Sequence, residues 1–386
     1  MQGTHRFYMM EKVVHGLPAA EILKAEVNRL GKSKIFLVTN KSMAAGPNLS
    51  EIGQSLGNLL AGQYAGVTAH APRQCVVEGA EAARAVGADL LVAVGGGSVI
   101  DATKVMQLCI RHSVRDPAAL SKFVTKQRGD PSTRPPDADL WIRSIAIPTT
   151  LSAAEFTWFG GASDPTRGVK EAFSNSMMIP QVVIMDPRMT MQTPARLLLT
   201  TGMKAVDHAA ERLASLTSSP FNEVVSGLAL RTLTSCLRAF HADPADLNAR
   251  AGLQYAAFLS MCGAAAGGTV GLSHAIGHAL GAHCGVPHGE TSCVALPAVM
   301  RWNRSSNAPQ QQLISDAMGV PEQAAASALA DLVKQLGLPQ SLRDVGVARD
   351  AIPLIAAKAF GDILIRTNPR AVNSVSDIQE VLETAF

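Results

Sequence analysis

Charge and aromatic side chains are scarce in this chain of 386 residues. Asp, Glu, Lys and Arg make up 17% of it and Phe, Trp and Tyr only 4%, against 47% hydrophobic residues. This balance excludes a disordered chain and supplies a substantial buried core, in a length that suits two domains. The net charge of +3 is spread along the chain without a basic cluster, so we expect no nucleic-acid partner.

Signals for secretion or a disulfide framework are also missing. The N-terminal segment carries charges early and has no apolar core of the signal-peptide type, and the six cysteines form no CxxC pair. We therefore expect a cytoplasmic protein.

The most informative absence is local. From Ala251 to Gly289 the chain contains no Asp, Glu, Lys or Arg. The stretch is interrupted by Gly and His, and no 18-residue window of it is purely apolar, so we expect no membrane span. A soluble segment without charge is typical of a buried core.

Four histidines nevertheless lie in that segment: His274, His278, His283 and His288. Buried imidazoles are costly unless they are hydrogen-bonded, stacked on a cofactor or bound to a metal. His274 and His278 are four residues apart and would share one face of a helix. One interpretation is four individually hydrogen-bonded core histidines. We favour the other, an active site.

The first half of the chain alternates predicted strands with predicted helices. Buried strands are expected at 34–40, 88–95, 142–150 and 181–187, a short strand at 66–72, and helices at 49–60, 77–87 and 99–111. The polar segment 115–139 is expected to be an exposed excursion containing a hairpin. This alternation favours a parallel sheet covered by helices.

The second half is predicted to be helical. Thr193 followed by Pro194 is typical of a helix start, and helices are expected at 194–216, 220–242, 248–266, 321–336 and 376–385. We place a boundary here, between an α/β domain of residues 1–193 and an all-α domain of residues 194–386.

Two loops in the first half suit a dinucleotide phosphate. A predicted strand ends on Gly95, Gly96 and Gly97 and enters a helix at Ser98, where backbone can approach a phosphate and the helix start offers free N–H groups. The motif continues to Asp101 and is not GxGxxG. A tight turn alone is the alternative. Three hydroxyls follow the next strand, at Thr149, Thr150 and Ser152, and capping is the alternative for each.

Four motifs in this order, GGGSVIDATK, IPTTLSAAE, GMKAVDHAAE and GLSHAIGHALG…PHGE, resemble the iron-containing (group III) alcohol dehydrogenase superfamily. PHGET, SLRDVGV and TNPR are similar to its maleylacetate reductase branch, which acts in the breakdown of aromatic compounds. The resemblance implies a Rossmann-like nucleotide-binding domain, a helical domain of the dehydroquinate synthase-like architecture, and an active site in the cleft between them. We also expect a homodimer.

The resemblance also implies roles for single residues. Gly95, Gly96, Gly97 and Ser98 would hold the pyrophosphate of NADH or NADPH, Thr149, Thr150 and Lys170 would line the nucleotide groove, and Asn40 would lie near the adenosine ribose. Asn40 is neutral and does not repel a 2′-phosphate, so NADPH is expected to be accepted.

The metal-binding members of the superfamily hold their ion with an Asp and three His. The His positions are His208, His274 and His288 here, with His278 as a further site residue, but the Asp position is Lys204. An ammonium repels a divalent ion by roughly 8 kcal/mol at 4 Å and an effective dielectric near 20. Iron or zinc is therefore possible but not favoured.

The leading hypothesis is a metal-free NAD(P)H-dependent reductase of a small keto acid or enone. Lys204, with a cationic His208, His274 or His278, would stabilise the oxyanion and supply a proton, and Arg370 would bind a substrate carboxylate. Lys204 as an ion-pair partner of Asp207, and Arg370 as a structural residue, are the alternatives. A metal-dependent alcohol dehydrogenase or aldehyde reductase, and a catalytically silent nucleotide-binding protein, remain competing functions.

Overall fold

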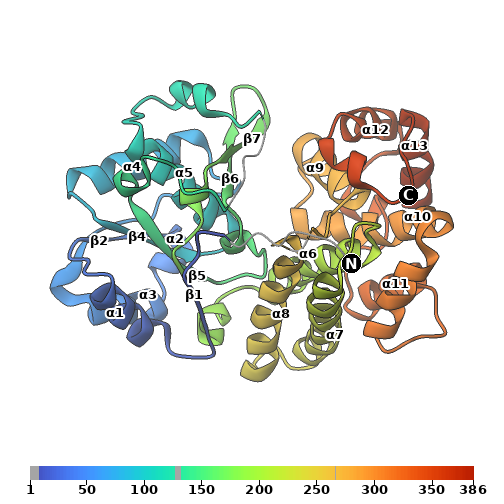
Figure 1. Cartoon of the computed structure of the whole chain (residues 1–386), viewed down its shortest axis with the longest axis horizontal. Coiled ribbons are helices and arrows are strands. Elements are labelled where there is room, and N and C mark those ends of the chain that lie inside the picture. Colours follow the sequence, from blue (N-terminus) through green and yellow to red (C-terminus); the bar gives the residue numbers. More distant parts are fainter. Residues whose placement is uncertain (1–7, 127–131, 266) are drawn as a thin grey trace. The chain divides into compact units, whose positions relative to one another are not determined.

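The computed structural model describes residues 8–126, 132–265 and 267–386. The chain divides into two compact units, with the division between Thr193 and Pro194. The first unit alternates strands and helices, and the second is built from helices (Figure 1). The predicted fold class, a parallel-sheet α/β half followed by a helical half, is confirmed.

The first unit contains a six-stranded parallel sheet with the strand order β1-β8-β5-β4-β2-β3. Its strands are β1 (Lys12–His15), β2 (Ile35–Val38), β3 (Leu60–Tyr64), β4 (Leu90–Gly95), β5 (Arg143–Pro148) and β8 (Val182–Met185). The helices of this unit are α1 (Ala19–Arg29), α2 (Lys41–Ala44), α3 (Pro47–Leu56), α4 (Arg73–Ala85) and α5 (Gly97–Arg111).

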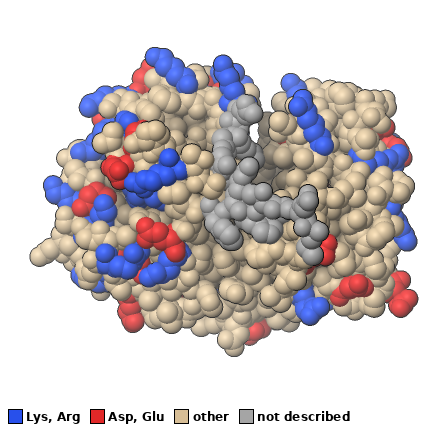
Figure 2. All heavy atoms as spheres, in the orientation of Figure 1, with Lys and Arg blue, Asp and Glu red and all other residues tan. Residues whose placement is uncertain are grey.

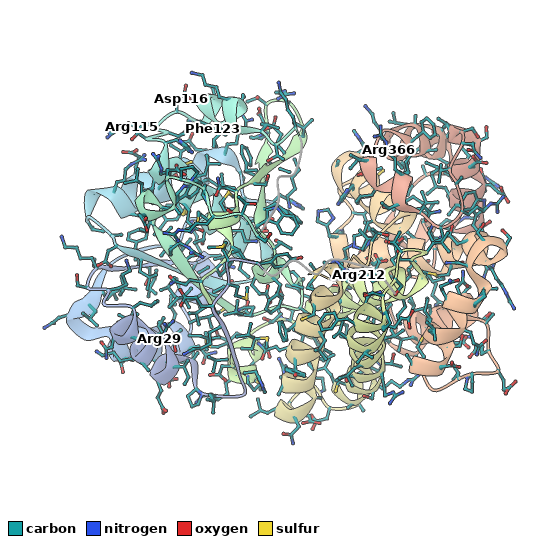
Figure 3. The ribbon with its side chains drawn as sticks, viewed as in Figure 1. Arg29, Arg115, Asp116, Phe123, Arg212 and Arg366 are labelled. Carbon is teal, nitrogen blue, oxygen red and sulfur yellow. The ribbon has the colours of Figure 1, made fainter. Side chains whose placement is uncertain are left out.

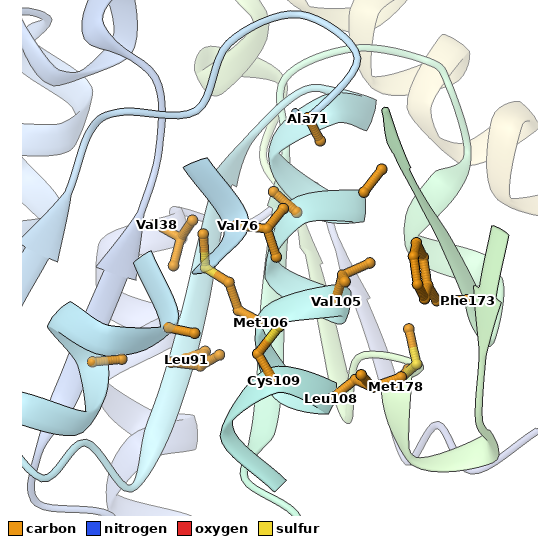
Figure 4. Close-up of a cluster of buried hydrophobic side chains, with 14 of the residues drawn as sticks. Val38, Ala71, Val76, Leu91, Val105, Met106, Leu108, Cys109, Phe173 and Met178 are labelled. Carbon is orange, nitrogen blue, oxygen red and sulfur yellow. The ribbon is translucent and has the colours of Figure 1, made fainter. Parts of the chain in front are cut away.

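Alternate side chains of the central strands enter two separate cores. Ile35 and Leu37 of β2 pack in the core that includes residues of α1 and α3. Phe36 and Val38 pack in the other core, with residues of α4 and α5 (Figure 4). Both faces of the sheet are therefore buried, which explains why its strands are continuous hydrophobic runs in the sequence.

An antiparallel hairpin of β6 (Phe159–Asp164) and β7 (Val169–Ser174) completes this unit. Phe173 of β7 packs in the same core as Val105 of α5 (Figure 4). Gly160 permits this packing, because a Cβ there would lie 2.9 Å from the backbone oxygen of Asp101.

Two expectations for the first unit are wrong. The hairpin lies at 159–174 and not within 115–139, where the described residues form 3₁₀ turns at Pro117–Phe123 and Ala138–Leu140; residues 127–131 lie outside the described residues. The strand expected at 66–72 is instead β3, because helix α3 ends at Leu56 and Gly57 turns the chain at φ 54°.

The second unit contains α6 (Ala195–Ala214), α7 (Pro220–Ala242), α8 (Leu247–Ala265), α9 (Leu272–Cys284), α10 (His288–Ala317), α11 (Ala325–Gln335), α12 (Ile352–Phe360) and α13 (Val375–Thr384). A core of residues from α9, α10, α12 and α13 surrounds Ile276 and Val299. The sequence predicted neither α10 nor α12, and the last residue of the helix expected at 248–266 lies outside the described residues. None of the helices in the described ranges is both long and apolar enough to cross a membrane.

The charged side chains on the face shown in Figure 2 are mixed in sign. Lys and Arg lie interspersed with Asp and Glu over both units, and no large patch of one sign forms on this face. On this face, charges of both signs are therefore distributed rather than gathered.

Helices α6 and α10 meet closely at Gly289. A Cβ at this position would lie 2.5 Å from the carbonyl carbon of Thr200, a backbone atom that cannot move alone. We expect Gly289→Ala to lower the free energy of unfolding by about 1–3 kcal/mol in urea denaturation, as overpacking usually does.

Gly227→Ala is the matched control for this variant. Gly227 lies within α7 and a Cβ there meets no atom within 4 Å, so this substitution should raise stability by about 0.5–1 kcal/mol. Equal effects of the two substitutions would contradict the close approach of α6 and α10.

Candidate functional site

The glycine loop of the first unit lies between the carboxyl ends of two adjacent parallel strands. Gly95 is the last residue of β4 and pairs with Pro148, the last residue of β5. Gly96 is the N-cap of α5 in extended conformation, and no side chain caps this helix. The first N–H groups of α5 therefore point out of the sheet edge, as in an anion-binding helix start.

The second predicted loop packs directly on the first. Thr149 donates its backbone N–H to the carbonyl of Gly95 at 3.0 Å. A Cβ on Gly96 would lie 2.9 Å from Cγ2 of Thr150, and one on Gly97 would lie 3.0 Å from Oγ of Ser152. The structure thus brings together the glycines and the hydroxyl groups that the sequence predicted as two separate loops.

Thr150 supplies an unused polar atom at this edge. Its side chain is buried, and Oγ1 has no hydrogen-bond partner among the described residues. Ser98 is engaged, since its Oγ accepts the backbone N–H of His70 at 3.1 Å. A backbone cradle without room for Cβ atoms, beside an unsatisfied hydroxyl, fits a phosphate group.

Lys170 and Asp101 form an ion pair over the hairpin. The Lys170 Nζ lies 3.6 Å from Oδ2 of Asp101, and the lysine stem crosses Gly161, where a Cβ would lie close to it. Asn40 follows β2 as the N-cap of α2, and its Oδ1 accepts the backbone N–H of Met43 at 2.9 Å. Capping thus occupies the amide oxygen of Asn40.

In the second unit, four polar residues share one face of α6. Lys204, Asp207, His208 and Glu211 are spaced by three and four residues, which places them one above another on a helix. The Lys204 Nζ lies 3.2 Å from Oδ2 of Asp207. The ion pair considered from the sequence therefore exists.

Asp207 is a deeply buried anion. Its side chain is fully inaccessible, and Oδ2 also accepts the Ser292 hydroxyl of α10 at 2.6 Å. Burial opposes ionisation, but the neighbouring His274 ring, the Lys204 ammonium and the hydrogen bond from Ser292 together outweigh it and lower the pKa of Asp207. The carboxylate is thus charged at neutral pH.

Helix α9 carries two of the expected site histidines. His274 is buried, its Nδ1 lies 2.6 Å from Oε2 of Glu211, and its ring stacks on His208 with centroids 5.0 Å apart. His278 is exposed, and its Nδ1 lies 2.7 Å from Oδ2 of Asp362. Each of these imidazoles therefore uses Nδ1 on a carboxylate.

Glu211 fixes the start of α9 as well as His274. Its two carboxylate oxygens accept the backbone N–H groups of Gly271 and Ser273, each at 2.9 Å. These bonds satisfy N–H groups that a helix start leaves unpaired. Glu211 therefore couples the position of α9 to that of α6.

The stacked pair of histidines is held neutral. Burial, together with the neighbouring His274 ring and the cations Lys204 and Arg212, lowers the pKa of His208 well below its usual range. Burial and Lys204 also lower the pKa of His274, against the carboxylates of Asp207 and Glu211. Arg212 (Figure 3) joins α6 to α8 by donating to the carbonyl of Ser260 at 2.8 Å.

The remaining predicted residues make other contacts. His288 is the first residue of α10, with its ring 6.5 Å from that of His278, and His283 is exposed. The Arg370 guanidinium stacks on Trp302 at 3.9 Å and donates to its carbonyl at 3.0 Å. This contact favours the structural alternative for Arg370.

Among the described residues, one group of His, Cys, Asp or Glu brings three ligand atoms within 4.8 Å of one another: Asp207, Glu211 and His274. His208 and His288 are not part of it. Both carboxylates of the group already accept hydrogen bonds, and Lys204 lies against it. Oδ1 of Asp207 and Nε2 of His274 have no hydrogen-bond partner among the described residues, so what opposes a divalent ion at this group is the ammonium of Lys204 and not a lack of ligand atoms.

The sequence missed Glu211, Ser292 and Asp362. Glu211 could have been found, because a charged residue seven positions after Lys204 repeats on the same face of the helix. Ser292 and Asp362 carry no such local signal, since each reaches the site from a distant helix or turn.

Comparison with known families identifies the chain. The model of iron-containing alcohol dehydrogenases matches residues 11–187, and that of the C-terminal domain of the Fe-containing alcohol dehydrogenase family matches residues 198–386. The chain belongs to the iron-containing alcohol dehydrogenase family. The superfamily predicted from the sequence is confirmed, and the chain is an oxidoreductase of a family that uses NAD(P)H.

Individual relatives cover nearly the whole chain. A maleylacetate reductase of Burkholderia cepacia is 30% identical over 97% of this chain and 95% of its own length. A lactaldehyde reductase of Escherichia coli K12 is 29% identical over 99% and 100%. The crystal structure of maleylacetate reductase from Agrobacterium tumefaciens superposes with a TM-score of 0.83 at 26% identity, covering 100% of this chain and 99% of that one.

A buried carboxyl follows the hydroxyl loop and gives a pH prediction. Burial raises the pKa of Glu155 to about 7 from an ordinary 4.5. Folding thus favours the neutral carboxyl, a contribution that is complete below pH 4.5 and lost as pH rises through 7. We expect Glu155→Gln to gain stability over the wild type across this window, by at most roughly 3 kcal/mol. Urea denaturation of the variant and the wild type at pH 4.5 and 7.5 measures the difference in their free energies of unfolding. The same difference at both pH values would contradict the burial of this carboxyl group.

Proposed function

We propose that this chain is an NAD(P)H-dependent reductase of the maleylacetate reductase type. It reduces a small keto acid or an enone-type substrate in the breakdown of aromatic compounds, works as a cytoplasmic homodimer and needs no resident metal. The Lys204–Asp207 pair carries the proposal, because a lysine stands where the resemblance implies a carboxylate ligand. The similarity to maleylacetate reductases supports it.

The first unit would hold the nucleotide. Gly96 and Gly97 leave the backbone open at the start of α5, and Thr150 offers its unsatisfied hydroxyl. Asn40 and Lys41 present no carboxylate to a 2′-phosphate, so NADPH is accepted as well as NADH. When bound, the reduced nicotinamide supplies the hydride.

The second unit would supply charge and a proton. The Lys204 ammonium stabilises the negative charge that develops on the substrate oxygen. The lowered pKa values of His208 and His274 leave these imidazoles neutral, whereas His278 is exposed and exchanges protons with water. His278 is therefore the proton donor among the three histidines. The carbonyl group of the substrate takes up the hydride and this proton and becomes an alcohol.

Turnover decides between the proposal and its competitors. Oxidation of NADPH and NADH is followed against maleylacetate, small keto acids and small aldehydes, with and without a chelator. We expect chelator-insensitive reduction of maleylacetate or a keto acid. Aldehyde reduction that a chelator abolishes would instead establish the metal-dependent alternative, which the similarity to lactaldehyde reductase favours. No turnover of any of these substrates would favour the third alternative, a catalytically silent nucleotide-binding protein.

Gly96→Val tests the nucleotide loop. A β-branched side chain would collide with Thr150 and obstruct the approach of a pyrophosphate to the start of α5. We expect NAD(P)H affinity, measured by fluorescence titration, to fall at least about tenfold, the equivalent of losing one charge-assisted hydrogen bond. Gly53→Ala in α3 is the control, since its Cβ meets only ordinary contact at 3.7 Å. Full affinity in folded Gly96→Val would refute the placement.

Lys204 variants test the metal-free site. Lys204→Ala should lower kcat by roughly 10²–10³, the usual result of losing one oxyanion donor. Lys204→Asp removes the repelling ammonium and should bind zinc or iron, detected by calorimetry and by new chelator sensitivity. Near-stoichiometric iron or zinc in the purified wild type, lost together with activity on stripping, would refute the assignment. So would a fully active Lys204→Ala.

A further inference from the structure

Helix α9 presents two histidine–carboxylate pairs, one turn apart. His274 meets Glu211 at 2.6 Å and His278 meets Asp362 at 2.7 Å, both through Nδ1. An ionised carboxylate only accepts hydrogen bonds, so each Nδ1 carries the proton. In the neutral imidazole this tautomer leaves Nε2 as an unprotonated acceptor.

The two pairs differ in their access to water. His274 is 6% exposed, and its Nε2 has no hydrogen-bond partner among the described residues. The side chain of His278 is 47% exposed, while its partner Asp362 is 19% exposed. Only the His278 pair can exchange a proton with solvent in the described structure.

Asp362 is itself held in a fixed orientation. It is the N-cap of the 3₁₀ turn Ile363–Thr367, and its Oδ1 accepts the backbone N–H of Leu364 at 2.9 Å. The Thr367 hydroxyl at the end of this turn donates to the carbonyl of Val270, just before α9, at 2.7 Å. One carboxylate oxygen is therefore tied to the turn, and the other is directed at His278.

We propose that Asp362 is a positioning residue that locks His278 in the Nδ1–H tautomer. The inference rests on the proposed function and extends it. Nε2 of His278 takes a proton from water and passes it to the substrate oxygen as the hydride adds to the carbonyl carbon. Asp362 keeps its own charge throughout and stabilises the imidazolium between these two transfers.

Asp362→Asn is the discriminating variant. Its amide oxygen can keep the bond to the Leu364 N–H, which turns the NH₂ group towards His278. Nδ1 must then accept, so the ring proton moves to Nε2 and the acceptor is lost. We expect kcat to fall on the order of 10²–10⁴-fold, the range of general acid–base catalysis, with KM changed less than about threefold.

The ring nitrogens give a readout that a merely structural role would not move. In ¹⁵N-histidine spectra, His278, assigned by its absence from His278→Gln, should be protonated on Nδ1 in the wild type and on Nε2 in Asp362→Asn. Asp344→Asn is the matched control: Asp344 also accepts backbone N–H groups, of Gln340 and Ser341, but among the described residues no histidine hydrogen-bonds to it. It should change neither the tautomer nor kcat.

Two results would overturn the inference. An unchanged His278 tautomer in Asp362→Asn would refute the lock. A changed tautomer with kcat within about threefold of wild type would refute the role in proton transfer. The spectra require no turnover, so a wild-type chain that reduces no substrate would refute the proposed function while the tautomer is still decided by the spectra.

Discussion

The attraction between Lys204 and Asp207 organises the helical unit. Asp207 has no exposed surface, and a buried carboxylate without a compensating cation would be strongly destabilising. Lys204 and the Ser292 hydroxyl satisfy one of its oxygens and fix α6 against α10. The second oxygen has no partner among the described residues. Fold and chemistry therefore depend on the same pair, since the cation that balances Asp207 is also the one available to a substrate oxyanion.

In the proposed function, a covalently attached charge takes the place of a bound ion. Glu211 is committed to the start of α9 and to His274, and the Lys204 ammonium lies against Asp207. The ammonium of a lysine needs no set of ligands to hold it, because it is covalently part of the folded chain. It carries one positive charge instead of two, so it polarises a carbonyl less. That difference suits a substrate already activated by conjugation or by a neighbouring carboxyl group.

The sequence predicted those parts of the molecule that depend on local pattern. The runs of β2, β4, β5 and β8 are apolar because both faces of the sheet are buried, and the glycines of the loop before α5 follow from the strand-to-helix turn. The sequence did not predict the elements whose position depends on packing between distant segments. Strand β1 (KVVH) is too short to show a period, and the β6–β7 hairpin depends on Gly160 lying against α5, a contact between distant segments.

The same limit explains which site residues the sequence could name. His274 and His278 stand out because an imidazole is conspicuous in a charge-free helix, but their tautomers are set by Glu211 and Asp362, 63 and 84 residues away. A pattern reveals the groups that react, while the groups that orient them are ordinary carboxylates at a helix cap or a turn. Because both carboxylates also hold backbone N–H groups, their orientation is fixed by secondary structure before any ligand binds. The tautomers of the site are thus a consequence of how α9 and the turn after α12 begin.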